Sequence, residues 1–135
     1  MNAVVREAES WLGTPYHHAA DVKGAGVDCA MLLVRVFCDL GLVAPFDPRP
    51  YPHDWMLHRS EERFLGIVER MGVQVDAPAP GRVALFRFGR CISHGAILAE
   101  DGYMIHADLR AGRVVRTETA RYQGRLHSIW SVNGV

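Results

Sequence analysis

The sequence lacks any apolar run long enough to cross a membrane. Its uninterrupted apolar stretches are short, as at Ala30–Val34, whereas a transmembrane helix needs about 20 such residues. It also lacks an excess of charge of either sign, because 15 lysines and arginines balance 15 aspartates and glutamates. We therefore expect no binding of nucleic acid. The N-terminal region carries Arg6, Glu7 and Glu9 rather than an apolar stretch, which predicts synthesis in the cytoplasm without a signal peptide.

Cysteine is scarce as well. Three residues, Cys29, Cys38 and Cys91, are too few and odd in number to form a disulfide framework. Cys29 and Cys38 fall on one predicted helix, about 13 Å apart, which is too far for a disulfide. Cys29 could approach Cys91 in space, but without an export signal we expect reduced thiols.

The length and composition argue against disorder and against a second domain. Apolar residues make up 49% of the 135 residues and charged residues 22%, which is typical of a folded protein. A chain of this length can bury one hydrophobic core but not two. We therefore predict a single domain over residues 1–135.

Helical patterns occupy the first half of the chain. Apolar residues recur at helical spacing in residues 2–12, and a strongly apolar helix follows Asp28, a typical N-cap residue, and ends at Gly41. Residues 44–53 contain four prolines and should be irregular. A third helix would begin at Asp54. Its apolar face would consist of Leu57, Phe64, Leu65, Val68 and Met71.

Strand patterns occupy the second half of the chain. Short segments rich in β-branched and aromatic residues are separated by turn residues. They are Val83–Phe88, Ser93–Ala99, Tyr103–Asp108, Arg113–Glu118 and Arg125–Val132. Helices followed by strands predict an α+β fold, with the helices on one side of an antiparallel sheet of about five strands.

Cys29 falls in the first turn of the apolar helix. A helix N-terminus carries a partial positive charge and unpaired N–H groups, which favour a thiolate and can bind an oxyanion. A nucleophilic cysteine also needs a histidine that accepts its proton and a third group that orients the imidazole. A buried, inert thiol is the alternative interpretation of this position.

His94 and His106 can fill those two roles only if the hairpin register places them on one face. A two-residue turn at Asp101-Gly102 would pair Ile97 with His106. The two histidines would then lie on opposite faces of the sheet. That register would exclude a catalytic pair.

A three-residue loop, Glu100–Gly102, gives the opposite result. It would pair Ala96 with His106 and His94 with Asp108, with glycine in the left-handed position that such a loop requires. Both histidines would then share a face as diagonal neighbours, about 7 Å apart at Cβ. A catalytic pair therefore predicts the three-residue loop.

Four segments of the chain carry motifs in a fixed order. They are Trp11–Tyr16, Gly26–Val34, Pro80–Phe86 and Ser93–Ala107. Together they resemble the NlpC-type cell-wall cysteine peptidases, which are papain-like hydrolases of bacterial peptidoglycan. The chain is most similar to the short variant found in the tails of phages and of phage-like gene transfer agents. The residues that carry this second similarity are Pro15–His18, Asp54, Trp55 and Arg59–Arg63.

The resemblance implies a papain-like NlpC fold with a Cys-His-His triad. Cys29 would be the nucleophile, at the N-terminus of a helix packed on the sheet. His94 would be the base and His106 the residue that orients it, with Asp108 as the rival for the orienting role.

The resemblance also assigns two residues beside the triad. The hydroxyl of Tyr16 would lie next to the nucleophile and help to bind the oxyanion or the substrate. Asp28 would bind substrate through the free amine of the first residue of the stem peptide, or act only as a helix N-cap. No metal or cofactor is implied.

The function that the resemblance implies is hydrolysis of peptidoglycan stem peptides, commonly at the D-γ-glutamyl–diaminopimelate bond. The expected setting is the tail of a phage-like particle that acts in the periplasm of a Gram-negative cell and opens the wall during DNA delivery. Other tail-tip or hub proteins would be its partners. The Pro-rich segment 44–60, which bears Phe46, Tyr51 and Trp55, is the predicted docking segment.

Four positions depart from the family pattern. Ala30-Met31 stands where Ser-Gly is usual, Arg82 replaces a common aspartate, and Gly95 replaces a β-branched residue. No predicted catalytic group is lost, but a neighbour of Cys29 has changed. A catalytically weak or inactive structural tail-tip protein is therefore the alternative function. A cytosolic amidase or acyltransferase with the same chemistry is a third.

The spacing of Cys91 and His94 also resembles half of a zinc site. The corresponding alternative to the triad is a metal site formed by Cys29, Cys91, His94 and His106.

Overall fold

The computed structural model describes residues 2–52 and 63–134. Helices come mostly before strands, as the sequence predicts. The helices are α1 (Ala3–Glu9), α2 (Cys29–Asp39) and α3 (Arg63–Met71). Two short pieces, β1 (Asp21–Val22) and β2 (Gly26–Val27), pair within the loop that leads to α2. The positions expected to start the third helix, Asp54 and Leu57, lie outside the described residues.

Six strands form the main sheet, in the order β3-β8-β4-β5-β6-β7. The central meander consists of β4 (Val83–Phe88), β5 (Cys91–Leu98), β6 (Tyr103–Asp108) and β7 (Arg113–Glu118). β8 (Leu126–Ser131) returns to pair with β4, and β3 (Val73–Val75) pairs with the outer edge of β8. The sequence analysis missed β3, because three residues are too short to show an alternating pattern.

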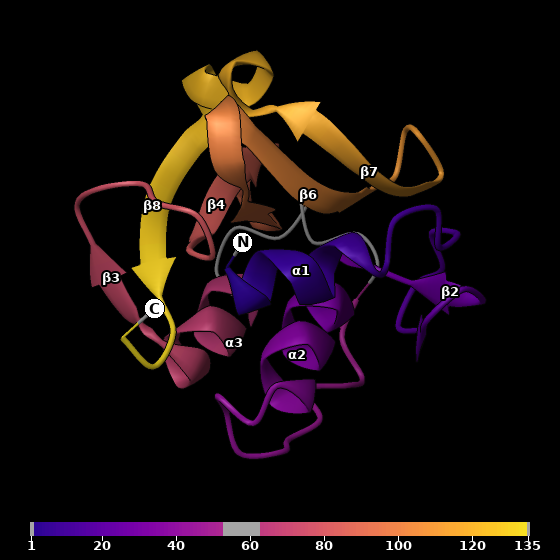
Figure 1. Ribbon diagram of the computed structural model, residues 1–135. Coiled ribbons are helices and arrows are strands. Elements are labelled where there is room, and N and C mark those ends of the chain that lie inside the picture. Colours follow the sequence, from indigo (N-terminus) through magenta and orange to yellow (C-terminus); the bar gives the residue numbers. More distant parts are fainter. Residues whose placement is uncertain (1, 53–62, 135) are drawn as a thin grey trace.

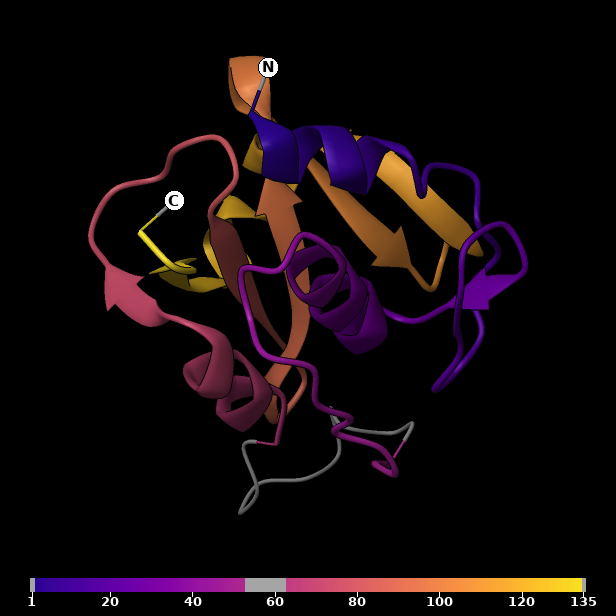
Figure 2. The same cartoon turned by 60° about the horizontal axis from the view of Figure 1, so that its bottom comes forward.

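The α-helices lie on one side of this sheet (Figures 1 and 2). α2 supplies the centre of the main hydrophobic core, with most of its residues buried. It begins at the expected cap, where the Asp28 side chain accepts a 2.8 Å hydrogen bond from the Met31 backbone N–H. The α+β class and the placement of the helices on one side of the sheet are therefore confirmed. No helix in the described ranges is long and apolar enough to span a membrane.

The opposite face of the sheet carries a second, smaller core. Tyr122 packs on it from the 3₁₀-helix η3 (Thr119–Arg125). The strand residues of this core are Ala84, Phe86, Ala96, Leu98, Met104 and Ile129. Along β4, β5 and β6 these residues alternate with residues of the main core, such as Leu85, Ile97 and Ile105, so both faces of the central strands are buried.

The hairpin between β5 and β6 has the three-residue loop that a histidine pair requires. Ile97 lies opposite Ile105, and Leu98 lies opposite Met104. This is the register in which His106 aligns with Ala96. Gly102 adopts a φ of 77°, as expected for the loop. Asp101 also has a positive φ, 59°, a conformation that aspartate tolerates better than most residues. The three-residue register is therefore confirmed.

Gly95 has a packing role that explains its departure from the family pattern. A Cβ atom added there would lie 2.9 Å from Leu33 Cδ1 and 3.0 Å from Phe64 Cε1. Leu33 and Phe64 are fully buried on α2 and α3. Glycine on β5 therefore lets both helices approach the sheet more closely than a β-branched residue would.

Candidate active site

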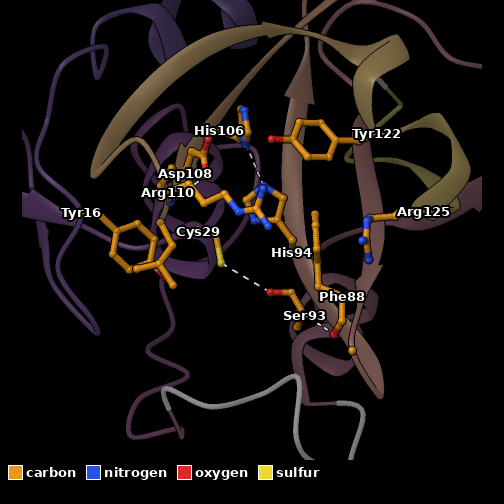
Figure 3. A pocket seen from close by; sticks show the side chains of 13 residues that line it. Tyr16, Cys29, Phe88, Ser93, His94, His106, Asp108, Arg110, Tyr122 and Arg125 are labelled. Carbon is orange, nitrogen blue, oxygen red and sulfur yellow. Dashed lines mark hydrogen bonds between the residues drawn. The ribbon is translucent and has the colours of Figure 1, made fainter.

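The predicted catalytic residues meet in one pocket of about 360 Å³. Tyr16, Cys29, His94 and His106 all contribute to its lining, although they come from a loop, a helix and two strands (Figure 3). The structure therefore brings together four positions that are up to 90 residues apart in the chain.

A β-bulge in β5 prepares this pocket. Phe86 pairs with His94, but the next residue, Arg87, pairs with Ile92, so Ser93 is the extra residue. Bulges next to active sites re-aim a neighbouring side chain. Here the bulge comes immediately before the candidate base, His94.

Cys29 is the first residue of α2 and is only 5% exposed. Its Sγ donates a weak hydrogen bond, 3.7 Å long, to the carbonyl oxygen of Ser93 (Figure 3). The thiol is thus held beside the backbone of the residue that precedes His94.

Two histidines and a threonine form a hydrogen-bonded chain behind the thiol. His94 Nε2 lies 2.7 Å from His106 Nδ1, and His106 Nε2 lies 3.0 Å from Thr117 Oγ1. Because Nε2 of His94 is engaged, Nδ1 is the nitrogen left to accept the thiol proton. A neutral His94 then carries its proton on Nε2 and donates it to His106, and His106 donates to Thr117.

Thr117 was not singled out from the sequence. It lies on β7 opposite Met104, which shares a face with His106 two residues along β6. The register of the β6–β7 hairpin could have identified it, since a polar side chain at that position must face the histidine. The rival orienting residue, Asp108, instead accepts a 3.0 Å hydrogen bond from the backbone N–H of Arg110.

Burial dominates the ionisation of the thiol. It raises the pKa of Cys29 well above the ordinary thiol value, and the carboxylate of Asp28 raises it further. Hydrogen bonds from the Tyr16 hydroxyl and from the backbone N–H groups of Ala30 and Cys29 lower it by less. The effect expected of the N–H groups at the helix N-terminus is present, but it is smaller than the effect of burial.

Burial also keeps both imidazoles neutral. It lowers the pKa of His94 from 6.5 to about 3, with a smaller contribution from His106. The rings of Phe86 and Phe88, whose centroids lie 6.1 and 5.5 Å from that of His94, provide much of this apolar surrounding. The pKa of His106 is likewise lowered by burial, against the opposing charge of Asp108. His94 is therefore in the protonation state of a base at neutral pH.

Tyr16 is fixed to the sheet through its backbone. Its N–H donates a 2.8 Å hydrogen bond to the carbonyl of Gly112, and Pro15 bridges to Arg113 at the start of β7. Burial, and after it the charge of Cys29, raises the pKa of the Tyr16 hydroxyl, so the hydroxyl stays protonated. It can therefore donate a hydrogen bond to negative charge that develops near the thiol.

Asp28 is buried behind the nucleophile, with 2% exposure. Its carboxylate accepts hydrogen bonds from the backbone N–H of Met31 at 2.8 Å, the backbone N–H of Ala19 at 2.7 Å and the hydroxyl of Tyr51 at 2.6 Å. These bonds from the chain itself match the N-cap interpretation. They occupy three of the roughly four acceptor positions of the carboxylate, and binding of a substrate amine by Asp28 stays a prediction.

The contact with Asp28 changes the interpretation of the Pro-rich segment. Residues 44–52 are irregular, as predicted. Tyr51 is buried, and Phe46 is half-buried under the guanidinium of Arg70, whose Cζ lies 4.3 Å from the ring centroid. The expectation of Tyr51 as a docking residue is therefore wrong, because its hydroxyl supports Asp28 inside the fold. Trp55 lies outside the described residues.

Cys91 does not extend the site. It begins β5, two residues before the predicted start of that strand at Ser93, and it is buried in the main core. All three cysteines are free thiols. Over residues 2–52 and 63–134, no group of three or more His, Cys, Asp or Glu side chains could hold a metal ion.

Comparisons with known proteins point to one group. The model of the NlpC/P60 family matches residues 13–131. A search of curated proteins gives no match. Among solved structures, the NlpC/p60 domain of the peptidoglycan hydrolase SagA matches with a TM-score of 0.65 and 20% identity, over 98% of this chain and all of that one.

Two longer proteins have the same fold over part of their length. An NlpC/P60 family protein from Bacillus cereus matches with a TM-score of 0.72 and 22% identity, over 96% of this chain and 39% of that one. The peptidoglycan hydrolase RipB from Mycobacterium tuberculosis matches with a TM-score of 0.67 and 20% identity, over 97% of this chain and 63% of that one. The chain thus spans less than two thirds of both proteins.

Proposed function

The chain belongs to the NlpC/P60 family, and on that premise we propose that it is a cysteine peptidase that hydrolyses stem peptides of peptidoglycan. The observation that supports this most is the chain of contacts in one pocket: a thiol at a helix N-terminus, a neutral imidazole, and two groups that fix its tautomer. SagA and RipB, which share the fold, are described as peptidoglycan hydrolases.

Acylation would begin when the scissile carbonyl reaches Cys29. The thiol proton moves to His94 Nδ1 as the sulfur attacks, and the carbonyl π electrons move onto its oxygen. The backbone N–H of Cys29 and the hydroxyl of Tyr16, which both interact with the thiol, would bind that oxyanion. The C–N bond then breaks, His94 returns its proton to the leaving amine, and a thioester remains.

Deacylation would use the same base. His94 removes a proton from water as the water oxygen attacks the thioester carbonyl. The C–S bond breaks, the sulfur regains the proton from His94, and the carboxylic acid product leaves. Since His94 has a pKa of about 3, its protonation in each half-reaction is transient. The hydrogen bond to His106 stabilises the imidazolium while it lasts.

The bond that we propose for cleavage is D-γ-glutamyl–diaminopimelate. The test is incubation of the purified protein with the tripeptide L-Ala-γ-D-Glu-diaminopimelate, followed by mass spectrometry. Release of free diaminopimelate by the wild type and by Cys38→Ala, but not by Cys29→Ala or His94→Ala, is the expected result. Absence of turnover by the wild type, or turnover by Cys29→Ala, would contradict the proposal.

We also propose that the protein works at the tail tip of a phage-like particle in the periplasm of a Gram-negative cell. The residues Pro15–His18 and the prolines of segment 44–52 support this setting through the resemblance stated above. Mass spectrometry of purified particles should detect the chain. Particles with Cys29→Ala should assemble but fail to deliver DNA, whereas normal delivery would favour the structural alternative.

A further inference from the structure

Two arginine side chains line the pocket that holds Cys29 and His94. Arg110 comes from the loop between β6 and β7, and Arg125 comes from the end of η3. They approach the pocket from opposite sides (Figure 3). Arg125 is occupied in part, because its Cζ lies 4.9 Å from the ring centroid of Phe88.

Ion pairing distinguishes these two guanidinium groups from three of the other arginines. Arg35, Arg49 and Arg116 each form an ion pair with a carboxylate. In the part of the chain that the structure describes, neither Arg110 nor Arg125 has such a partner. An unpaired guanidinium in a concave site is a ready partner for an anionic ligand group.

The backbone under Arg110 is held in place. The Arg110 N–H donates to Asp108 Oδ1 at 3.0 Å, and the Gly112 N–H donates to the Asp108 carbonyl at 2.9 Å. The carbonyl of Gly112 in turn accepts the hydrogen bond from Tyr16. The loop is thus tied to the wall of the pocket, and from it the Arg110 side chain extends inward toward His94 (Figure 3).

We propose that Arg110 binds a substrate carboxylate beside the scissile amide, and that it thereby selects γ-glutamyl peptides with a free α-carboxylate. The argument rests on the proposed function. A γ-linked glutamate reacts through its side-chain carboxyl and keeps its α-carboxylate within the same residue. A guanidinium binds that carboxylate through paired, charge-assisted hydrogen bonds. An α-carboxamide, as in a γ-linked isoglutamine, carries no charge and cannot replace it.

The test measures binding separately from cleavage. Calorimetry on Cys29→Ala protein compares L-Ala-γ-D-Glu-diaminopimelate with the same peptide amidated at the α-carboxyl. We expect the acid to bind about 10- to 100-fold more tightly than the amide. Adding Arg110→Gln should remove this preference by weakening the binding of the acid peptide and leaving the binding of the amide unchanged. The matched control is Arg113→Gln, which removes an exposed arginine three residues away, outside the residues that line the pocket, and should keep the preference.

The possible outcomes separate the binding role of Arg110 from the proposed peptidase activity. Equal affinity for acid and amide, or equal weakening of both by Arg110→Gln, overturns the role of Arg110 even if the wild type cleaves the peptide. An Arg110-dependent preference without cleavage by the wild type supports the binding role and contradicts the peptidase. If neither peptide binds and neither is cleaved, both proposals fail.

Discussion

Replacing Thr117 by valine tests the hydrogen-bonded chain that fixes the base. Valine has nearly the same shape but no hydroxyl, so the change removes the 3.0 Å bond to His106 Nε2. His106 is only 1% exposed, and its Nε2–H would then be a buried donor without its partner. Such a loss costs about 1–3 kcal/mol.

This cost falls on the arrangement that catalysis needs. When His94 holds the thiol proton, its Nε2–H must donate to His106 Nδ1, which requires the proton of His106 to be on Nε2. Without Thr117 to accept that proton, His106 favours the other tautomer. We therefore expect kcat/KM for the stem tripeptide to fall by about 5- to 150-fold.

The control is Thr117→Ser, which keeps the hydroxyl. It should restore kcat/KM to within about threefold of the wild type, because the acceptor for His106 remains. Imidazole ¹⁵N shifts should show the changed tautomer of His106 in Thr117→Val, a readout that loss of packing alone would not alter. Wild-type activity in Thr117→Val, or equal impairment in both variants, would refute this reasoning.

Three further experiments test the effects of burial and packing. Because burial raises the pKa of the Cys29 thiol, iodoacetamide should label Cys29 more slowly than the half-buried Cys38 at pH 7, as followed by intact mass. Rapid labelling of Cys29 below pH 7 would contradict the raised thiol pKa. The pKa of His94 is about 3 when folded and 6.5 ordinarily, so below pH 6.5 the unfolded chain takes up a proton that the folded chain does not. The free energy of unfolding of the wild type, measured in urea, should therefore fall by about 2 kcal/mol between pH 6.5 and pH 4.5, and that of His94→Gln should lack this loss. Parallel losses in the two proteins would disprove this. Gly95→Ala should destabilise the fold by about 1–3 kcal/mol through overpacking. The control is Gly66→Ala on α3, where an added Cβ meets nothing within 4 Å, and it should stabilise the fold by about 0.5–1 kcal/mol. Equal effects of the two variants on the melting temperature would argue against the close contact at Gly95.

Much of the site could be predicted from local sequence patterns. The aspartate at position 28 and the apolar run after it predicted where α2 begins, and capping depends on residues within one turn. Turn chemistry is equally local and restricted the hairpin after β5 to two registers. The requirement that His94 and His106 share a face then predicted the three-residue loop, Glu100–Gly102, that the structure has.

The functions of two other residues were not predicted. The bond between Thr117 and His106 lies within the β6–β7 hairpin, and extending the register to β7 would have identified it. Tyr51 is twenty-three positions from Asp28, and its bond exists only after the irregular segment has packed beside the start of α2. The short strand β3 likewise exists through its pairing with β8, more than fifty residues later.

The sequence by itself therefore determined the family, the α+β order of elements and the cap of α2. These follow from residue spacing, turn chemistry and motif order. Only the tertiary structure decided the charge state of Cys29 and the orientation of His94. Both depend on how much apolar surface surrounds a group and on which polar atoms reach it. Burial outweighed the helix N-terminus at the thiol, because desolvation in a packed interior acts more strongly on a charge than a few partial charges do.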